Sequence, residues 1–421
     1  MNCDIAIVGG GLAGASLAVA LAPLGYDIKV IEAVAYKASE QPSYDDRTLA
    51  LSHSSCRILS GIGLWEMLEA DATAIRKIFI TELARPGQVV LDPVEMGLTE
   101  FGHVVEARRF GVAVTSLLER TGNIEVISPA TVKNIDIGGS GTSLSLESAG
   151  GTDVLEARLV VAADGANSFI RNHLQIPTKK RDYGQTAVIC NITPEEPHEG
   201  RAFECLTDTG PFAVLPHTGK RCGLVWSVAT ANASEILGLD DETFLARAQA
   251  RFGTQLGGFL KAGQRTAYPL KLVRASEDVR ERLVILGNAA HAIHPIGAQG
   301  FNLALRDAAV LAEILADDDL GDPGETGLLH TYSAWRQQDQ RGTIAASDGM
   351  TRLFSHPSAL AAGLRTTGLI AHAISPSLRR YSAIKAMGYR CLLYTSDAAD
   401  ESSRGGWGGG GGGGGVGGGG G

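Results

Sequence analysis

The first thirty-two residues constrain the fold more than any other part of the chain. An apolar run over residues 4–8 predicts a buried strand, residues 9–14 form a glycine-rich turn, and residues 15–24 predict a helix. Residues 27–32 predict a second strand, and Gly25 ends the helix before it. A strand–helix–strand unit of this length is a right-handed βαβ crossover, so we expect a parallel sheet covered by helices.

The spacing Gly9-x-Gly11-x-x-Gly14 is typical of a dinucleotide-binding turn. The first glycine permits the tight turn, the second lets the backbone approach a pyrophosphate, and the third lets the helix pack on the strand. Free N–H groups at the helix start favour an anion. Glu32 ends the second strand, where it can bond the ribose of an adenosine. A turn that serves only packing is the alternative interpretation.

A second motif begins where a fully apolar run at residues 159–163 meets Asp164 and Gly165, with Arg171 following. A buried strand that ends in Asp-Gly brings a carboxylate to the nucleotide-binding edge of the sheet. The alternative is an ordinary turn, because Asp-Gly is a common turn former.

The third motif is the longest and the least expected by chance. A strand leads to Asn288, whose amide can bond ribityl hydroxyls, and Pro295 stiffens the loop that follows. Gly297 and Gly300 let backbone N–H groups reach a flat ring. We expect a helix to start near Asn302 with its positive end aimed at that ring, where a reduced flavin carries negative charge.

Composition excludes several classes of protein. A net charge of -9 and a pI of about 5.6 argue against nucleic-acid binding. Six cysteines without a CxxC pair indicate a reduced, cytosolic chain with no metal site. No run of 18 apolar residues exists, and the nearest, residues 358–374, is interrupted by Arg365, so a membrane span is not expected.

These motifs together resemble the FAD-dependent aromatic hydroxylases built like p-hydroxybenzoate hydroxylase, and the resemblance covers about residues 1–390. Within that family the chain looks most similar to the ubiquinone-biosynthesis branch and there to the 2-octaprenyl-6-methoxyphenol hydroxylases. The stretches that carry this are residues 46–51, 102–106, 198–204, 267–270 and 287–290. Asn288 stands where most of the wider class has aspartate, and that branch also uses asparagine.

The resemblance implies an α/β fold: a Rossmann-like FAD-binding domain of three β/β/α layers, an inserted antiparallel-sheet substrate domain, and C-terminal helices. We expect the FAD-binding domain at 1–75, 104–180 and 271–350, the substrate domain at 76–103 and 181–270, and the helices at 351–390.

Residues 391–421 form a separate segment that resembles translated adaptor sequence followed by glycine. Such a chain has few side chains to bury, so we expect it to be disordered and non-native. A natural flexible linker is the alternative.

The resemblance also implies the cofactors, FAD and NAD(P)H, and the residues that bind FAD. Arg47 would reach the pyrophosphate or the flavin edge, although a surface ion pair is the alternative for this residue. The expected cofactor-binding residues are Gly9, Gly11, Ala13, Gly14, Glu32, Arg47, Asp164, Gly165, Asn288, Pro295, Gly297, Gln299, Gly300, Phe301 and Asn302.

The implied reaction is hydroxylation of a polyprenylated phenol by O2 and NAD(P)H, through a C4a-hydroperoxyflavin whose distal oxygen the phenol attacks. Such chemistry needs a dry pocket and no nucleophilic triad. No catalytic residue can be assigned from sequence. Tyr183, His217 and Tyr268 are candidates for a phenol base because they precede or lie in the sheet expected to cover the substrate, and a structural role is the alternative for each. His291 and His294 are interpreted as ordinary hydrogen-bonded loop histidines.

Three alternatives remain open. A sister hydroxylase could act at another carbon of the same phenol. A prenyl-chain reductase or a flavin halogenase is the second, although the Trp-x-Trp-x-Ile-Pro stretch of halogenases is absent. A non-catalytic flavin- or quinone-binding partner in the pathway is the third. The expected location is the cytoplasm, with peripheral contact to the inner membrane and to other ubiquinone-biosynthesis proteins left open, and no nucleic-acid partner.

Overall fold

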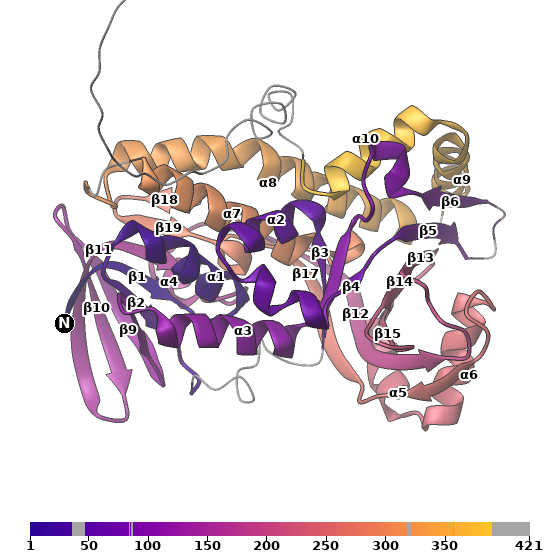
Figure 1. Cartoon of the computed structure of the whole chain (residues 1–421), viewed down its shortest axis with the longest axis horizontal. Coiled ribbons are helices and arrows are strands. Elements are labelled where there is room, and N and C mark those ends of the chain that lie inside the picture. Colours follow the sequence, from indigo (N-terminus) through magenta and orange to yellow (C-terminus); the bar gives the residue numbers. More distant parts are fainter. Residues whose placement is uncertain (36–46, 84, 86, 318–320, 357, 390–421) are drawn as a thin grey trace, which may run out of the picture.

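The computed structural model describes residues 1–35, 47–83, 85, 87–317, 321–356 and 358–389. Asp46 of the resemblance motif and the segment 391–421 therefore lie outside the described residues. The described chain forms two large sheets side by side, with the long helix α8 (Thr326–Ser355) running above both (Figure 1).

The first sheet belongs to the FAD-binding part. Its strands are β1 (Asn2–Val8), β2 (Ile28–Ile31), β8 (Ile124–Ile127), β9 (Ala130–Ile137), β10 (Thr142–Ser148), β11 (Gly151–Ala162), β18 (Val279–Arg280) and β19 (Leu283–Ile285). Five of them, in the order β19-β11-β1-β2-β8, are mutually parallel. Strands buried on both faces read as continuous apolar runs, which is why residues 4–8 and 159–163 were recognisable in the sequence.

The two faces of this sheet pack against different layers. One face packs against helices α1 (Leu12–Leu21), α3 (Ala107–Arg120), α7 (Gln299–Ala316) and α8 through an apolar cluster that includes Ile5, Ile7 and Val161. The other face, with Ala6 and Val160, packs against side chains of β9 and β10. Alternation along each strand thus produces the expected three β/β/α layers.

The second sheet, called the substrate sheet below, has the strand order β20-β17-β12-β15-β14-β13-β5-β6. Its strands are β5 (Lys77–Glu82), β6 (Gln88–Leu91), β12 (Thr178–Pro194), β13 (Arg201–Thr207), β14 (Gly210–Pro216), β15 (Cys222–Ala229), β17 (Thr266–Ala275) and β20 (His291–Ala292), with β16 (Phe259–Ala262) beside β12. A small sheet of β3 (Thr48–Ser52), β7 (Gly102–Glu106) and β4 (Thr73–Ala74) lies between the two large ones. We propose that the division between the two large sheets follows the domain boundaries expected from the sequence.

The substrate sheet has an outer and an inner face. The outer face packs on α5 (Ala233–Gly238) and α6 (Asp241–Phe252) in one apolar cluster. The inner face is turned toward the FAD-binding part: Gln185 accepts a hydrogen bond from His294 at 3.1 Å, and Gly223 lies directly against Thr48 of β3. The inner face therefore bounds the space between the two parts.

The remaining helices are α2 (His53–Gly61), α4 (Phe169–His173), α9 (Ala359–Ile374) and α10 (Pro376–Ala386). Helices α9 and α10 follow α8 and cover the β5–β6 end of the substrate sheet (Figure 1). Within the described residues, no helix combines the length and apolar content that crossing a membrane requires.

A buried network of charges joins α7 to α8 and to the third motif. Asp307 accepts hydrogen bonds from His291 at 2.5 Å and from Arg336 at 2.7 Å. Arg336 also bonds Asp339, which accepts a second bond from Arg306 at 2.7 Å. Both arginines hold the pKa of Asp339 below its usual range against the effect of burial, so two cations face two anions away from water. The network fixes α7 against the loop that precedes it.

We predict that Asp307→Ala destabilises the protein by about 3–5 kcal/mol, because it leaves Arg336 buried with half of its partners. Urea unfolding followed by circular dichroism measures this. The matched control is Asp317→Ala at the exposed end of the same helix, which should change the free energy of unfolding by less than about 0.5 kcal/mol. A loss below about 1 kcal/mol for Asp307→Ala would show that the network does not support the fold.

Candidate active site

The three motifs meet at one edge of the parallel sheet. Strand β1 ends at the glycine turn, β2 ends just before Glu32, β11 ends before Asp164, and β19 ends before Asn288. Because these strands are adjacent and parallel, their carboxyl ends lie at the same edge, where open α/β sheets bind ligands. The structure thus brings together segments almost three hundred residues apart in the sequence.

The glycine turn has no room for side chains at two positions. A β-carbon at Gly9 would lie 2.5 Å from the carbonyl oxygen of Ala163, and one at Gly14 would overlap the carbonyl oxygen of Gly9. Gly9 also has a φ of 106°, a conformation that favours glycine. Glu32 is buried and accepts a hydrogen bond from the backbone N–H of Gly10 at 2.7 Å, so the acid at the end of β2 supports the turn itself.

Asp164 faces the same edge from β11. One carboxylate oxygen accepts a hydrogen bond from the N–H of Ile170 at 3.2 Å, while the other, Oδ1, is buried without a hydrogen-bond partner among the described residues. Burial raises the pKa of Asp164, although a bond from Ser168 lowers it. An unpartnered buried oxygen at a nucleotide-binding edge indicates a missing donor, such as a ligand hydroxyl.

Arg171 follows the Asp-Gly pair in the sequence and is not among the cofactor-binding residues expected from it. Its side chain is 1% exposed and donates to the carbonyl oxygens of Ala289 at 2.6 Å and Ala166 at 2.7 Å. It therefore ties the Asp-Gly loop to the segment that carries Asn288. The signal was the arginine one turn after Asp-Gly, but its partner 118 residues away could not be identified from sequence.

The third motif packs directly on the first. A β-carbon at Gly287 would lie 3.1 Å from that of Ala13 at the start of α1, so the two motifs are in contact. The loop then turns through Gly297 and Ala298, which both adopt positive φ angles, 66° and 52°. Helix α7 consequently starts at Gln299, three residues before the expected start near Asn302. The chain already turns at residues 297–298, so the helix begins earlier than the sequence pattern predicts.

The side chains of this motif have different environments. Asn288 is exposed at the edge and is available to a ligand. Asn302 accepts from the N–H of Ser52 at 2.9 Å and donates to the carbonyl of Ala50 at 2.8 Å, so its amide fastens β3 to α7. Phe301 packs edge to face against Phe110, with ring centroids 5.2 Å apart. A role of Asn302 and Phe301 in cofactor binding would therefore fall to their backbone.

Gln299 lies at the first turn of α7, next to Gly300. Its amide nitrogen donates to the carbonyls of Gly297 and Ala386, both at 3.0 Å, and its Oε1 is buried without a hydrogen-bond partner in the described part of the chain. Like Asp164, Gln299 thus presents a polar atom that a bound group could satisfy.

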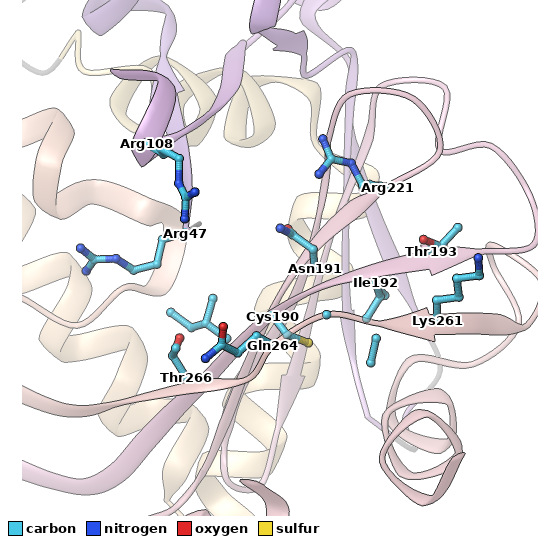
Figure 2. A pocket seen from close by; sticks show the side chains of 13 residues that line it. Arg47, Arg108, Cys190, Asn191, Ile192, Thr193, Arg221, Lys261, Gln264 and Thr266 are labelled. Atoms are coloured by element: carbon cyan, nitrogen blue, oxygen red, sulfur yellow. The ribbon is translucent and has the colours of Figure 1, made fainter. Parts of the chain in front are cut away.

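A cavity of about 440 Å³ lies between the FAD-binding part and the substrate sheet (Figure 2). Arg47 and Arg108 lie on one side of it, and Asn191, Arg221 and Lys261 lie on the sheet side. The guanidinium carbon of Arg47 lies 4.9 Å from the centroid of the Tyr268 ring, so Arg47 bridges the two parts as a cation–π contact. The cavity is lined by four cationic side chains.

The three candidates for a phenol base are engaged in other contacts. Tyr183 donates to Asp348 at 3.0 Å, and burial raises the pKa of its hydroxyl well above the usual value. His217 is buried beside Thr218, with 2.9 Å between Nδ1 and the hydroxyl, and burial lowers its pKa. Tyr268 lies against Arg47. None of these contacts places a free base opposite the flavin motif.

The two loop histidines are hydrogen-bonded within the protein. His291 bonds Asp307, as described above, and His294 bonds Gln185 while accepting from the N–H of Ile296 at 3.2 Å. Burial lowers the pKa of His294 to about 4, so it stays neutral. In the described residues no three His, Cys, Asp or Glu side chains form a group that could hold a metal ion.

Comparison with known proteins defines the class. The family described as FAD binding domain matches residues 2–347. Among solved structures, p-nitrophenol 4-monooxygenase PnpA from Pseudomonas putida superposes with a TM-score of 0.76 at 18% identity, covering 92% of this chain and 99% of that one. The fold and the family match together define an FAD-dependent monooxygenase of the aromatic-hydroxylase type.

Sequence relatives narrow the assignment. Ubiquinone hydroxylase UbiL of Rhodospirillum rubrum is 37% identical over 387 residues, covering 91% of this chain and 89% of the relative. The 3-demethoxyubiquinol 3-hydroxylase of Escherichia coli is 30% identical over 392 residues, covering 91% and 98%. The chain belongs to the family of FAD-dependent ubiquinone hydroxylases.

We predict that Gly14→Ala abolishes FAD uptake, because the added methyl group overlaps the carbonyl of Gly9 and must displace the turn. Flavin absorbance of the purified variant and fluorescence titration with FAD measure the loss. The control is Gly61→Ala at the end of α2, where a β-carbon meets no atom of the described residues within 4 Å. Retention of bound FAD by Gly14→Ala at the wild-type level would contradict the assignment of the turn.

Proposed function

We propose that this enzyme hydroxylates the ring of a polyprenylated methoxyphenol in ubiquinone biosynthesis, using O2 and electrons from NADH or NADPH. The observation that carries the proposal is the convergence of the three motifs at one sheet edge, with the inner face of the substrate sheet opposite. Apolar side chains on that face, such as Ile189 and Val225, would suit an apolar aromatic ring.

The residues at the edge fit FAD. The glycine turn leaves its backbone bare, and a β-carbon at either Gly9 or Gly14 would fill that space. Asp164 and Gln299 each present a buried oxygen that the described residues leave unbonded. FAD carries hydroxyl and ring N–H groups that can donate hydrogen bonds to such oxygens. The fit thus rests on features at both ends of the site.

Different residues of the chain would hold different parts of the cofactor. The turn and the start of α1 would bind the pyrophosphate, and Asp164 and Asn288 would bind the ribityl side of the cofactor. The start of α7 would lend its positive end to the flavin ring and favour negative charge on it. FAD, when bound, supplies the activation of oxygen. The inner face of the substrate sheet would exclude water from the flavin ring.

The cationic cavity fits the reductant. Arg47, Arg108, Arg221 and Lys261 together suit the phosphates of NADH or NADPH, which must approach the flavin from outside. Glu106 partly offsets this charge through its contact with Arg221 at 3.3 Å. The reductant would therefore enter between the two parts of the molecule.

Purified protein is predicted to contain FAD and to oxidise NADPH faster when a short-chain prenylated methoxyphenol is added. Mass spectrometry should show one added oxygen atom, and NMR of the product assigns the ring carbon. The Escherichia coli relative is named as a 3-hydroxylase, so a product hydroxylated at that carbon would identify the sister activity instead. NADPH oxidation that leaves every prenylated phenol unchanged would refute the proposed substrate.

We also propose that α9 and α10 contact the bilayer that holds the substrate. Leu360 and Ile374 of α9 are 76% and 75% exposed, and Leu364 lies between them at 58%. Residues 349–389 contain five basic side chains and no aspartate or glutamate, although the whole chain carries a net charge of -9. An apolar stripe within a basic segment suits an anionic membrane surface.

The predicted consequence is that full-length protein sediments with vesicles of phosphatidylcholine and phosphatidylglycerol more than with phosphatidylcholine alone. The double change Leu364→Glu and Ile374→Glu should abolish sedimentation, because it removes apolar area and adds like charge. Val154→Glu is the control, since Val154 is 50% exposed on β11, far from α9 in the sequence. Equal sedimentation of all three proteins would contradict the assigned surface.

A further inference from the structure

The inner face of the substrate sheet differs from the outer face in accessibility. On the outer face the side chains of Val188, Trp226 and Phe203 are 0%, 3% and 4% exposed, because α5 and α6 cover them. On the inner face Ile189 and Val225 are only partly buried, although their chain neighbours are packed away. The inner face therefore retains open surface between the two parts of the molecule.

One row of inner-face residues crosses the sheet in register. The pairs are Ile189 with Val225, Val225 with Ala213, and Ala213 with Glu204. Paired residues on one face lie about 5 Å apart, so the row spans roughly 15 Å. Ile189 lines the cavity between the two parts, and the row ends at Glu204 on β13. The row thus connects a residue that lines the cavity to a carboxyl group on the same face of the sheet.

Glu204 has no evident structural role on this face. Its neighbours across the strands are Ile80 and Ala213, and its own strand presents Ala202 beside it. Oε1 is buried without a hydrogen-bond partner among the described residues, and burial raises the pKa of the carboxyl to about 7. An acid among apolar side chains costs stability unless a ligand bonds it.

Glu204 is not alone in lacking a partner on this side of the sheet. Ser227 of β15 lies on the inner face, and Thr48 of β3 lies opposite Gly223; both hydroxyls are buried and unbonded within the described chain. Gln299 of the flavin motif adds a third unbonded oxygen. Unbonded polar atoms on the inner face, and on segments of the FAD-binding part, are of the kind that a polar ligand group satisfies.

We propose that Glu204 is the residue that binds the hydroxyl of the phenol and accepts its proton, an inference that rests on the proposed function. The ring O–H bond breaks, its electron pair stays on the ring oxygen, and the proton forms a bond to Oε1. The phenolate is the more electron-rich ring and reacts more readily with an electrophilic oxygen. After hydroxylation the proton returns to the ring oxygen, and the proton lost from the ring carbon passes to water.

The surroundings of Glu204 suit this step. An ordinary glutamate, with a pKa of about 4.3, is a far weaker base than a phenolate, whose parent has a pKa of about 10. Raising the carboxyl pKa to about 7 narrows that difference by roughly half. Burial alone causes the rise, so a bound apolar substrate, which removes more water, would act in the same direction.

The charged groups on the elements around β13 are paired with each other. Glu82 of β5 accepts from Arg365 of α9 at 2.7 Å, and Arg85 lies 3.3 Å from the same carboxylate oxygen. Helix α8, which packs against β13 and β14, presents Asp348, which is bonded by Arg181 at 2.6 Å. Arg352 lies 3.9 Å from Asp348. These charged side chains therefore have partners of opposite sign other than Glu204.

The test compares wild type, Glu204→Gln and Glu204→Leu, all loaded with FAD, on a short-chain prenylated methoxyphenol. Glu204→Gln is expected to lower kcat by about 100-fold or more while KM changes by only a few fold. The wild-type kcat should fall as the pH drops below about 7, where the carboxyl becomes protonated, and the variant should lack this limb. Glu196→Gln, an exposed acid before the same strand, is the control and should behave as wild type.

A binding measurement separates this inference from the proposed function. The wild-type protein should bind the phenol at least about tenfold more tightly than its methyl ether, and Glu204→Leu should bind the two equally. Both variants should fold, because Oε1 of the carboxyl that they replace is buried without a hydrogen-bond partner in the described part of the chain. A phenol preference unchanged by Glu204→Leu, or a kcat of Glu204→Gln within threefold of wild type, overturns the inference. Absence of hydroxylation by the wild type refutes the proposed function, and the binding ratio still decides the role of Glu204.

Discussion

Backbone hydrogen bonding between β19, β11, β1 and β2 is the constraint on which the candidate site depends. The four strands are parallel, so each contributes its carboxyl end to one edge, and the register leaves the glycine turn, Asp164 and Asn288 as neighbours. A strand placed in the opposite direction would send its motif to the far edge. The chemistry of the site is therefore a consequence of sheet topology more than of any single side chain.

Contacts within the protein itself hold that edge of the sheet rigid. Arg171 joins two of the loops through carbonyl oxygens, and the buried charges around Asp307 and Arg336 fix α7 behind the third. Buried ion pairs of this kind add little net stability, but each one is costly to break. Their effect is to allow one position of the α7 start relative to the glycine turn, as a preorganised binding edge requires.

Local features were predictable from sequence, and features set by distant contacts were not. The glycine spacing and the apolar strands predicted the βαβ unit because turn geometry and burial act over a few residues. The start of α7 was misplaced by three residues because Ala298, which is not glycine, adopts a positive φ. Arg171 and Glu204 went unassigned because the partner of one and the face of the other depend on pairings far along the chain.

The face of the substrate sheet on which Glu204 lies is likewise set by the packing of its neighbours. Period-two alternation puts Phe203 and Cys205 into the outer core and leaves Glu204 on the other side, so the position of the carboxyl is fixed by its neighbours' burial. A leucine at this position would pack against Ile80 and Ala213 at no electrostatic cost. Proteins tolerate such a local cost chiefly where function requires it. Glu204 as a whole is only half-buried, but the cost of burying its Oε1 without a partner in the described chain is an argument that this oxygen meets the substrate.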